Sequence, residues 1–122
     1  MQVAAETALE EGEGFVAQTV GSFRANRDYA LETLASVPGV TVPHADGAFY
    51  LFPRVDGLAD SFDFCRRLLL EERVGLAPGS AFGSSGEGSL RLCYAADRSV
   101  LEPALERLVR FLGAERGRAG TR

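Results

Sequence analysis

The apolar residues between positions 15 and 35 recur every three or four residues, and most of the charged residues in this stretch fall between them. This period predicts a long amphipathic helix. Its apolar side is expected to contain Phe15, Val16, Val20, Phe23, Ala30, Leu31 and Leu34. Pro38 and Gly39 should end the helix, because proline cannot continue the hydrogen-bonding ladder and glycine tolerates the turn that follows.

Short apolar runs predict strands in the middle of the chain. Residues 40–43 and 48–53 are bounded by turn residues and are too short for buried helices, so we expect them to pair as a hairpin. Residues 61–73 return to helical spacing, and Asp60 or Ser61 can cap their first turn. The apolar face of this second helix is expected to contain Phe62, Cys65, Leu68 and Leu69.

The last part of the chain alternates between strand, loop and helix patterns. Residues 74–77 and 89–95 are strand candidates. The glycine- and serine-rich segment 78–88 between them predicts a loop with unusual backbone angles. A helix should close the domain over residues 100–112, and residues 113–122 have the composition of a frayed, flexible tail.

The closing helix has a capping signal and a leucine stripe. Ser99 and Glu102 have the spacing of a capping box. The buried stripe is expected to be Leu101, Leu105, Leu108 and Leu112. Together the elements predict an α+β fold, in which a long N-terminal helix is followed by a small mixed or antiparallel sheet covered by helices. The 122 residues suffice for one such domain.

Charge and hydropathy narrow the possible functions. The net charge is −4 and the two signs are interleaved, so no basic stripe is available for nucleic-acid phosphates or anionic lipid. The first dozen residues lack the apolar run of a signal peptide, and no segment approaches membrane-spanning length. We therefore expect a cytoplasmic protein without nucleic-acid or membrane partners. Its two cysteines, Cys65 and Cys93, are expected to be reduced and buried.

Arginine supplies all 13 basic residues, and the sequence contains no lysine. No Schiff base can therefore form through a lysine side chain. His44 is the only histidine and has no companions for a nucleophile or a metal site, so it is expected at the surface. The sequence thus predicts neither a catalytic residue nor a metal ligand.

Arg91 lies in the middle of an otherwise apolar predicted strand. Leu90, Leu92 and Tyr94 share one face of that strand, and Arg91 and Cys93 share the other. A buried, unpaired arginine would cost several kcal/mol, so the side chain should either face solvent or meet a carboxylate. Its guanidinium can grip a substrate carboxylate through two parallel hydrogen bonds. An ordinary arginine at the surface remains the alternative.

Three segments together resemble the C-terminal end of the class I and II aminotransferases. These segments are Gly47–Pro53 (GAFYLFP), Val74–Gly83 (VGLAPGSAFG) and Gly88–Ala95 (GSLRLCYA), in the order and spacing of that family. The resemblance extends from about residue 5 to residue 112. It implies the small domain of a fold type I, aspartate aminotransferase-like enzyme, which is part of a larger α/β fold.

The resemblance implies roles for several residues. Arg91 would grip the α-carboxylate of an amino acid or 2-oxo acid. The turn and strand from Gly47 to Tyr50 would line the substrate entrance, with Gly47 and Phe49 as site candidates, and the loop 78–88 would lie beside the site. Residues 15–112 would form the small domain, with the helix 15–37 joining it to a large domain and residues 1–14 leading in. The large domain would supply the lysine that binds pyridoxal phosphate, so this chain alone is not expected to bind the cofactor. The family is usually homodimeric.

Three functions therefore remain open. The chain could be a truncated or split aminotransferase that is inactive without its large domain. It could instead be a stand-alone module that binds an amino acid or a dicarboxylate through Arg91. The third possibility is a structural interaction domain that docks through its long helix and apolar surface.

Overall fold

The computed structural model describes residues 1–120, with side chains as far as residue 118. It shows the α+β fold that the sequence predicts. The helices are α1 (Gln2–Glu11), α2 (Glu13–Ala35), α3 (Ser61–Glu72) and α4 (Arg98–Gly120), with 3-10 turns at Gly79–Phe82 and Ser84–Gly86. The strands are β1 (Val40–Thr41), β2 (Tyr50–Leu51), β3 (Arg54–Val55), β4 (Ala77–Pro78) and β5 (Leu90–Cys93). Within these residues, no helix is long and apolar enough to cross a membrane.

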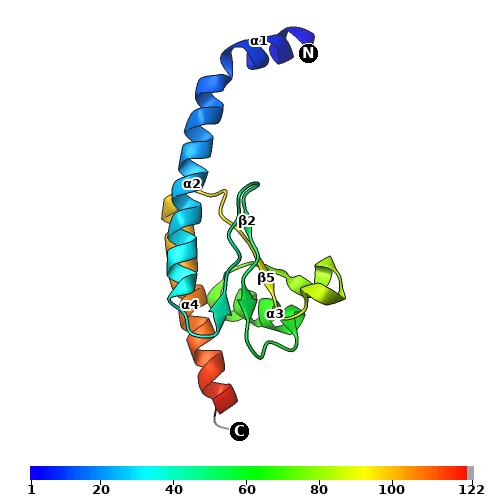
Figure 1. Cartoon of the computed structure of the whole chain (residues 1–122), viewed down its shortest axis with the longest axis vertical. Helices are drawn as coiled ribbons and strands as arrows, with labels where there is room; N and C mark the ends of the chain where they lie inside the picture. Colours follow the sequence, from blue (N-terminus) through cyan, green and yellow to red (C-terminus); the bar gives the residue numbers. More distant parts are fainter. Residues whose placement is uncertain (121–122) are drawn as a thin grey trace.

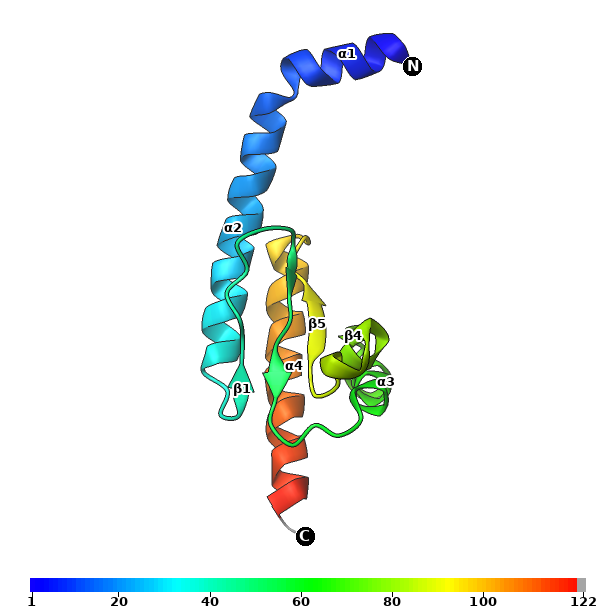
Figure 2. The ribbon, with the colours of Figure 1, turned by 45° about the vertical axis from the view of Figure 1, so that its right-hand side comes forward.

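Helix α1 and the first half of α2 form an arm that extends beyond the rest of the molecule (Figures 1 and 2). Residues 1–14, expected as a lead-in, are largely helical. The second half of α2 packs beside α4, where Ala30 and Leu34 are fully buried. By contrast, Phe15 on the arm is 74% exposed. The apolar side predicted for this helix is therefore covered only over its second half.

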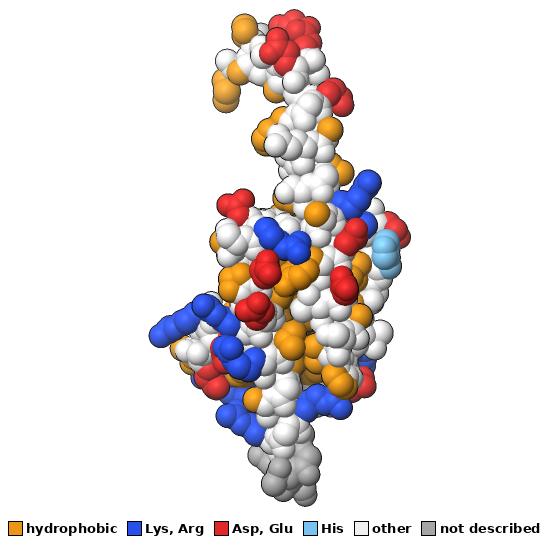
Figure 3. All heavy atoms as spheres, turned by 90° about the vertical axis from the view of Figure 1, so that its left-hand side faces the viewer, with side chains coloured by type: hydrophobic (Ala, Val, Ile, Leu, Met, Phe, Trp, Pro, Cys, Tyr) orange, Lys and Arg blue, Asp and Glu red, His pale blue; other side chains and the backbone are white. Residues whose placement is uncertain are grey.

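Exposed apolar side chains are spaced along the arm, as Figure 3 shows in orange. They are Met1, Val3, Leu9, Phe15, Val16 and Val20. In the same view, charged side chains of both signs are scattered over the body below the arm, with orange and white surface between them. A projecting helix with an uncovered apolar side is typical of a surface that contacts another domain or chain.

Five short strands form two antiparallel sheets. The three-stranded sheet has the order β2–β5–β4, and the two-stranded sheet joins β1 to β3. The prediction that residues 40–43 pair with residues 48–53 is therefore wrong, because β1 pairs with residues 54–55 instead. Pro53 separates β2 from β3 and has no N–H to donate, and its carbonyl accepts a hydrogen bond from Leu90 N at 2.9 Å.

One face of the three-stranded sheet packs on the helices and forms the core. Leu90, Leu92 and Tyr94 are buried there, as the alternation along β5 predicts. The leucine stripe of α4 is also confirmed, and Phe111 joins it. The other buried members of this core are Ala30, Leu34, Val37, Leu51, Phe64, Cys65, Leu68 and Val74.

The predicted apolar face of α3 is only half right. Cys65 and Leu68 are buried, but Phe62 and Leu69 are exposed, and Phe64 takes the place that Phe62 was expected to fill. The Phe64 ring packs edge-on against Phe111 of α4, with the ring centroids 5.2 Å apart. The cap is as predicted, because the Asp60 side chain accepts a hydrogen bond from Asp63 N at 2.8 Å.

The last helix departs from the prediction at both ends. It begins at Arg98, so Ser99 lies inside the first turn instead of capping it. The segment expected to be a frayed tail continues as helix to Gly120, and residues 121–122 of that tail lie outside the described residues. Glu115 contributes to the extension, because its carboxylate pairs with Arg67 of α3 at 2.6 Å. The hydrogen bond that Arg67 donates holds the pKa of the Glu115 carboxyl below its ordinary value.

Asn26 fastens α2 to the end of β5. Its side chain is 3% exposed, and its Nδ2 atom donates to Tyr94 O at 3.1 Å and to Ala96 O at 2.7 Å. Replacing it by alanine should lower the free energy of unfolding by about 1–3 kcal/mol, because carbonyls lose their buried donor. Urea denaturation followed by circular dichroism measures this, with exposed Ser22→Ala on the same helix as the control. Equal stability of the two variants would contradict the role given to Asn26.

Candidate functional site

Among the described residues, no α-helix covers the second face of the three-stranded sheet, and this face carries the candidate site. Arg91 and Cys93 of the central strand β5 point to this side, opposite to the buried leucines. Tyr50 pairs directly with Cys93 across the sheet, and paired residues in antiparallel strands share a face. We call this surface, defined by Tyr50, Arg91, Cys93 and the adjacent Phe82, the open face.

The Arg91 guanidinium lies between two aromatic rings. Its central carbon is 4.4 Å from the centroid of the Tyr50 ring and 4.3 Å from that of the Phe82 ring. Both distances are within the range of cation–π attraction. Among the described residues, no carboxylate or hydrogen-bond acceptor contacts the guanidinium. The two rings thus restrict the rotation of the Arg91 guanidinium plane. Its N–H donors remain available to a ligand.

The Phe82 ring reaches Arg91 from the loop that the sequence predicts between residues 78 and 88. Gly83 (φ 106°) and Gly88 (φ 83°) have the unusual backbone angles expected there, although two 3-10 turns also form. Phe82 also packs edge-on against Phe52, with the ring centroids 5.8 Å apart. The resemblance implies that Tyr50 belongs to the segment lining the entrance and that the loop with Phe82 lies beside the site. It does not identify the two rings as contacts of Arg91, because these contacts depend on the strand register and on the path of the loop.

Gly47 and Phe49, the other two predicted site residues, lie farther along the same segment. The Phe49 ring is 4.6 Å from the Tyr50 ring and 6.0 Å from that of Phe23 on α2, so it reaches Arg91 only through Tyr50. Gly47 lines a separate hollow of about 220 Å³ between the 46–48 turn and α2. The structure therefore brings Phe49 next to Tyr50 of the open face, whereas Gly47 lies in the separate hollow beside α2.

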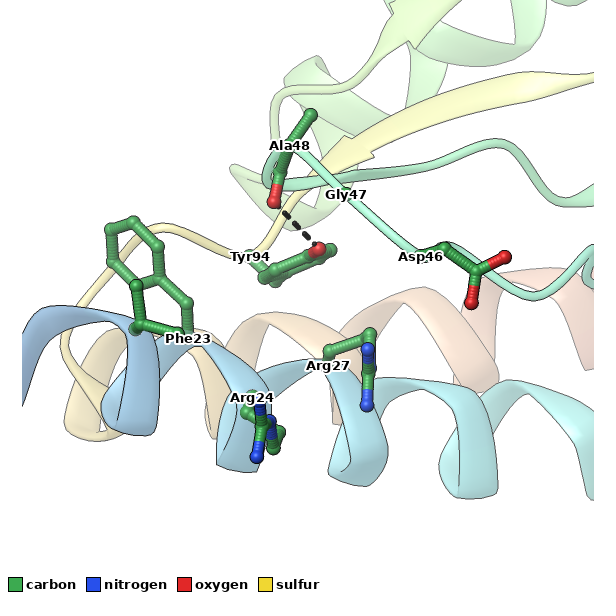
Figure 4. A pocket seen from close by; sticks show the side chains of 8 residues that line it. Phe23, Arg24, Arg27, Asp46, Gly47, Ala48 and Tyr94 are labelled. Atoms are coloured by element: carbon green, nitrogen blue, oxygen red, sulfur yellow. Dashed lines mark hydrogen bonds between the residues drawn. The ribbon is translucent and has the colours of Figure 1, made fainter. Parts of the chain in front are cut away.

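The hollow beside Gly47 is shown in Figure 4. Phe23, Arg24 and Arg27 come from α2 and lie across from the 46–48 turn, while Tyr94 comes from the end of β5. The Tyr94 hydroxyl donates to Ala48 O at 3.0 Å, and Ala48 has a positive φ of 58°. A non-glycine residue in this region is uncommon, so the Tyr94 hydrogen bond helps to hold the turn that precedes Phe49.

His44 is exposed, as predicted, and its Nδ1 atom lies 3.1 Å from a carboxylate oxygen of Asp46. In the part of the chain that the structure describes, no group of three His, Cys, Asp or Glu side chains could hold a metal ion. The open face is built around the Arg91 cation and the Tyr50 and Phe82 rings, which suits an anionic organic ligand.

The two cysteines differ in exposure, so the prediction that both are buried is correct only for Cys65. Burial raises the pKa of the Cys65 thiol to about 11. Cys93 is exposed on the open face. We expect one thiol to react with Ellman's reagent in the folded protein and two in urea, because the thiolate is the reactive form and burial suppresses it. A Cys93→Ser variant that still reacts quickly when folded would contradict this assignment.

Comparisons with known proteins show that this chain is similar to aminotransferases. The chain is 39% identical over 112 residues to the putative aminotransferase YugH of Bacillus subtilis, matching 91% of this chain and 29% of that protein. It is 40% identical over 113 residues to the aspartate aminotransferase of Thermotoga maritima, matching 93% of this chain and 28% of that enzyme. No protein-family model matches the chain.

Solved structures give the same result. The aromatic aminotransferase of Pyrococcus horikoshii superposes with a TM-score of 0.83 at 35% identity, over 94% of this chain and 31% of that one. The chain thus spans about three tenths of the length of the relatives it matches. In sequence and in fold, it corresponds to the C-terminal small domain of the aspartate-type, pyridoxal-phosphate-dependent aminotransferases.

Proposed function

We propose that this chain is the substrate-carboxylate-binding part of a pyridoxal-phosphate-dependent aminotransferase, and that it works together with a lysine-bearing large domain. The observation that carries the proposal is the Arg91 guanidinium, which is clamped between Tyr50 and Phe82 without an acidic partner in the described residues. Such a fork can accept the α-carboxylate of an amino acid or a 2-oxo acid through two parallel hydrogen bonds. The relatives' names, which include aspartate aminotransferases, support this substrate class.

Three residues of the open face have a physical task in this proposal. Arg91 fixes the position of the substrate carboxylate, and the Tyr50 and Phe82 rings limit rotation of its guanidinium. Closure of the large domain over this face would exclude water from the ion pair, which would strengthen it. Holding the carboxylate at a fixed point orients the remainder of the substrate, including its Cα–H bond, toward groups of the large domain.

The residues of this chain do not fit pyridoxal phosphate by themselves. The sequence contains no lysine, so no side-chain amine is available to hold the cofactor covalently. Bound cofactor would supply the electron sink for the reaction, and that chemistry belongs to the large domain. We therefore propose that transamination requires the large domain, whether in the same polypeptide or on a separate chain.

A hybrid enzyme tests this proposal. The 113 matching residues of the Thermotoga maritima aspartate aminotransferase would be replaced by this chain, keeping the large domain of that enzyme. We expect the hybrid to bind pyridoxal phosphate and to transfer the amino group of an amino acid to a 2-oxo acid. This chain alone should show neither activity. A hybrid that folds and binds the cofactor but does not turn over would contradict the proposal.

The uncovered arm supports the same proposal independently of Arg91. The exposed apolar residues of α1 and α2 need a partner surface, and a large domain would provide one. The hybrid is therefore also expected to bury these side chains. A stand-alone dicarboxylate-binding module is the competing function, and tight binding of a dicarboxylate by the isolated chain, with no activity in the hybrid, would favour it.

A further inference from the structure

The Phe82 ring can clamp Arg91 only if its loop has a fixed position. Within this loop, residues 79–88, the backbones of Gly79 and Gly86 lie against each other. A Cβ atom added to Gly79 would lie 1.9 Å from Gly86 O, and one added to Gly86 would lie 2.2 Å from Gly79 O. Only glycine fits at such a close backbone approach. Gly79 N also donates to Ser89 O at 2.8 Å, which ties the start of the loop to its end.

The closed loop is joined to the first turn of α3 through Ser61 and Glu87. Ser61 is fully buried, and its hydroxyl donates to Ser80 Oγ at 3.1 Å and accepts from Ser80 N at 3.2 Å. The Glu87 carboxylate accepts from Ser61 N at 2.8 Å and from Gly88 N at 3.1 Å. Glu87 of the loop therefore binds the backbone of α3, and the Ser61 side chain of α3 binds Ser80 of the loop.

The charge of Glu87 suits this position. The first N–H groups of a helix have no partner within the helix and carry a partial positive charge, so a carboxylate is stabilised there. Hydrogen bonds from Ser61, followed by the one from Gly88, hold the pKa of Glu87 below its ordinary value of 4.5. Glu87 is thus ionised at neutral pH and accepts these bonds at full strength.

We propose that Glu87 and Ser61 are positioning residues for Arg91, acting through the loop: they fasten residues 79–88 to α3 and so keep the Phe82 ring against the guanidinium. The role of this clamp in binding a substrate carboxylate rests on the function proposed above. The clamp itself can be tested without any substrate.

The test is the nuclear magnetic resonance signal of the Arg91 Nε–Hε group in this chain, assigned by its loss in Arg91→Lys. Protons above an aromatic ring are shifted upfield, so Tyr50 and Phe82 should both shift this signal. Phe82→Leu measures the part of the shift that comes from Phe82. Glu87→Ala and Ser61→Ala are expected to lose most of that same part, although both leave Phe82 in the sequence.

Two further variants separate this effect from general loss of structure. Glu102→Ala removes a glutamate of α4 that pairs with Arg98 at 3.6 Å, and it should leave the Arg91 signal unchanged. Glu87→Gln keeps an acceptor oxygen of the same reach and should restore most of the shift that Glu87→Ala loses.

A folded Glu87→Ala variant with the wild-type Arg91 signal would overturn the proposal. If Glu87→Ala does not fold, Ser61→Ala decides in the same way: a Phe82→Leu-like signal supports the proposal and a wild-type signal overturns it. No carboxylate is present in this experiment. Failure of the hybrid enzyme would therefore refute the proposed function, whereas an unchanged Arg91 signal would refute only the positioning role.

Discussion

Replacing Arg91 by leucine in the hybrid enzyme is expected to lower kcat/KM on the order of 10²-fold or more. The reason is that truncating one partner of a desolvated, hydrogen-bonded ion pair costs about 2–5 kcal/mol. Apart from the Tyr50 and Phe82 rings, the guanidinium has no acidic or hydrogen-bonding partner among the described residues, so its removal should act mainly on the binding of the substrate carboxylate. Steady-state kinetics with varied amino donor measure the change.

Two matched variants sharpen this prediction. Arg91→Lys keeps the charge but loses the bidentate fork, so it should retain part of the activity and lose roughly ten-fold in kcat/KM. Arg107→Leu makes the same exchange on the exposed surface of α4, where the guanidinium donates to Glu72 O at 3.4 Å, and should be close to wild type. If Arg91→Leu and Arg107→Leu had equal kinetics, Arg91 would not be the carboxylate ligand.

The second large effect is expected from the core. Leu105→Ala should lower the free energy of unfolding by about 2–5 kcal/mol, because it removes apolar contacts and leaves a cavity beneath the sheet. Leu105 is 1% exposed and belongs to the α4 stripe that packs against β5. A domain of this size has a total stability of only about 5–15 kcal/mol, so the variant should be close to unfolding at 37 °C.

Urea denaturation followed by circular dichroism measures this loss. Leu70→Ala is the matched control, because it makes the same exchange on α3 where Leu70 is 56% exposed. Its effect should be within about 0.5 kcal/mol of zero. A similar loss in both variants would mean that the α4 stripe is not the layer that supports the open face.

The sequence was sufficient where local patterns determine the outcome. The alternation along residues 90–94 correctly separates the buried leucines from Arg91, and the leucine period of the closing helix identifies its buried stripe. Pro38 and Gly39 follow the end of α2 as predicted, and Gly39 adopts a φ of 74°.

The sequence did not predict the features that depend on contacts between distant segments. β1 pairs with β3 instead of β2, and the neighbours of Arg91 come from residue 50 and from a loop at residue 82. Neither the register of the sheet nor the path of the loop follows from local spacing. Phe62 and Phe64 of α3 both fit a helical apolar face, and only the position of Phe111 selects Phe64.

The exposed first half of α2 shows another limit of sequence patterns. Phe15, Val16 and Val20 continue the apolar spacing of the helix, and yet they lie on the projecting arm. A period identifies which side of a helix is suited to burial, but it does not say what covers that side. In this chain, the proposed large domain would cover the exposed apolar side of the first half of α2.

Direct binding of a carboxylate to Arg91 is the most immediate test of the open face as a substrate site. The isolated chain would be titrated with succinate while the guanidinium signals of all arginines are followed by nuclear magnetic resonance. We expect the Arg91 signal to shift and saturate with a dissociation constant on the order of 1 mM, as suits a single bidentate pair, and the neutral diamide of succinate to leave it unchanged. An Arg91 signal that does not move, or that moves no more than those of the surface arginines, would contradict the carboxylate site.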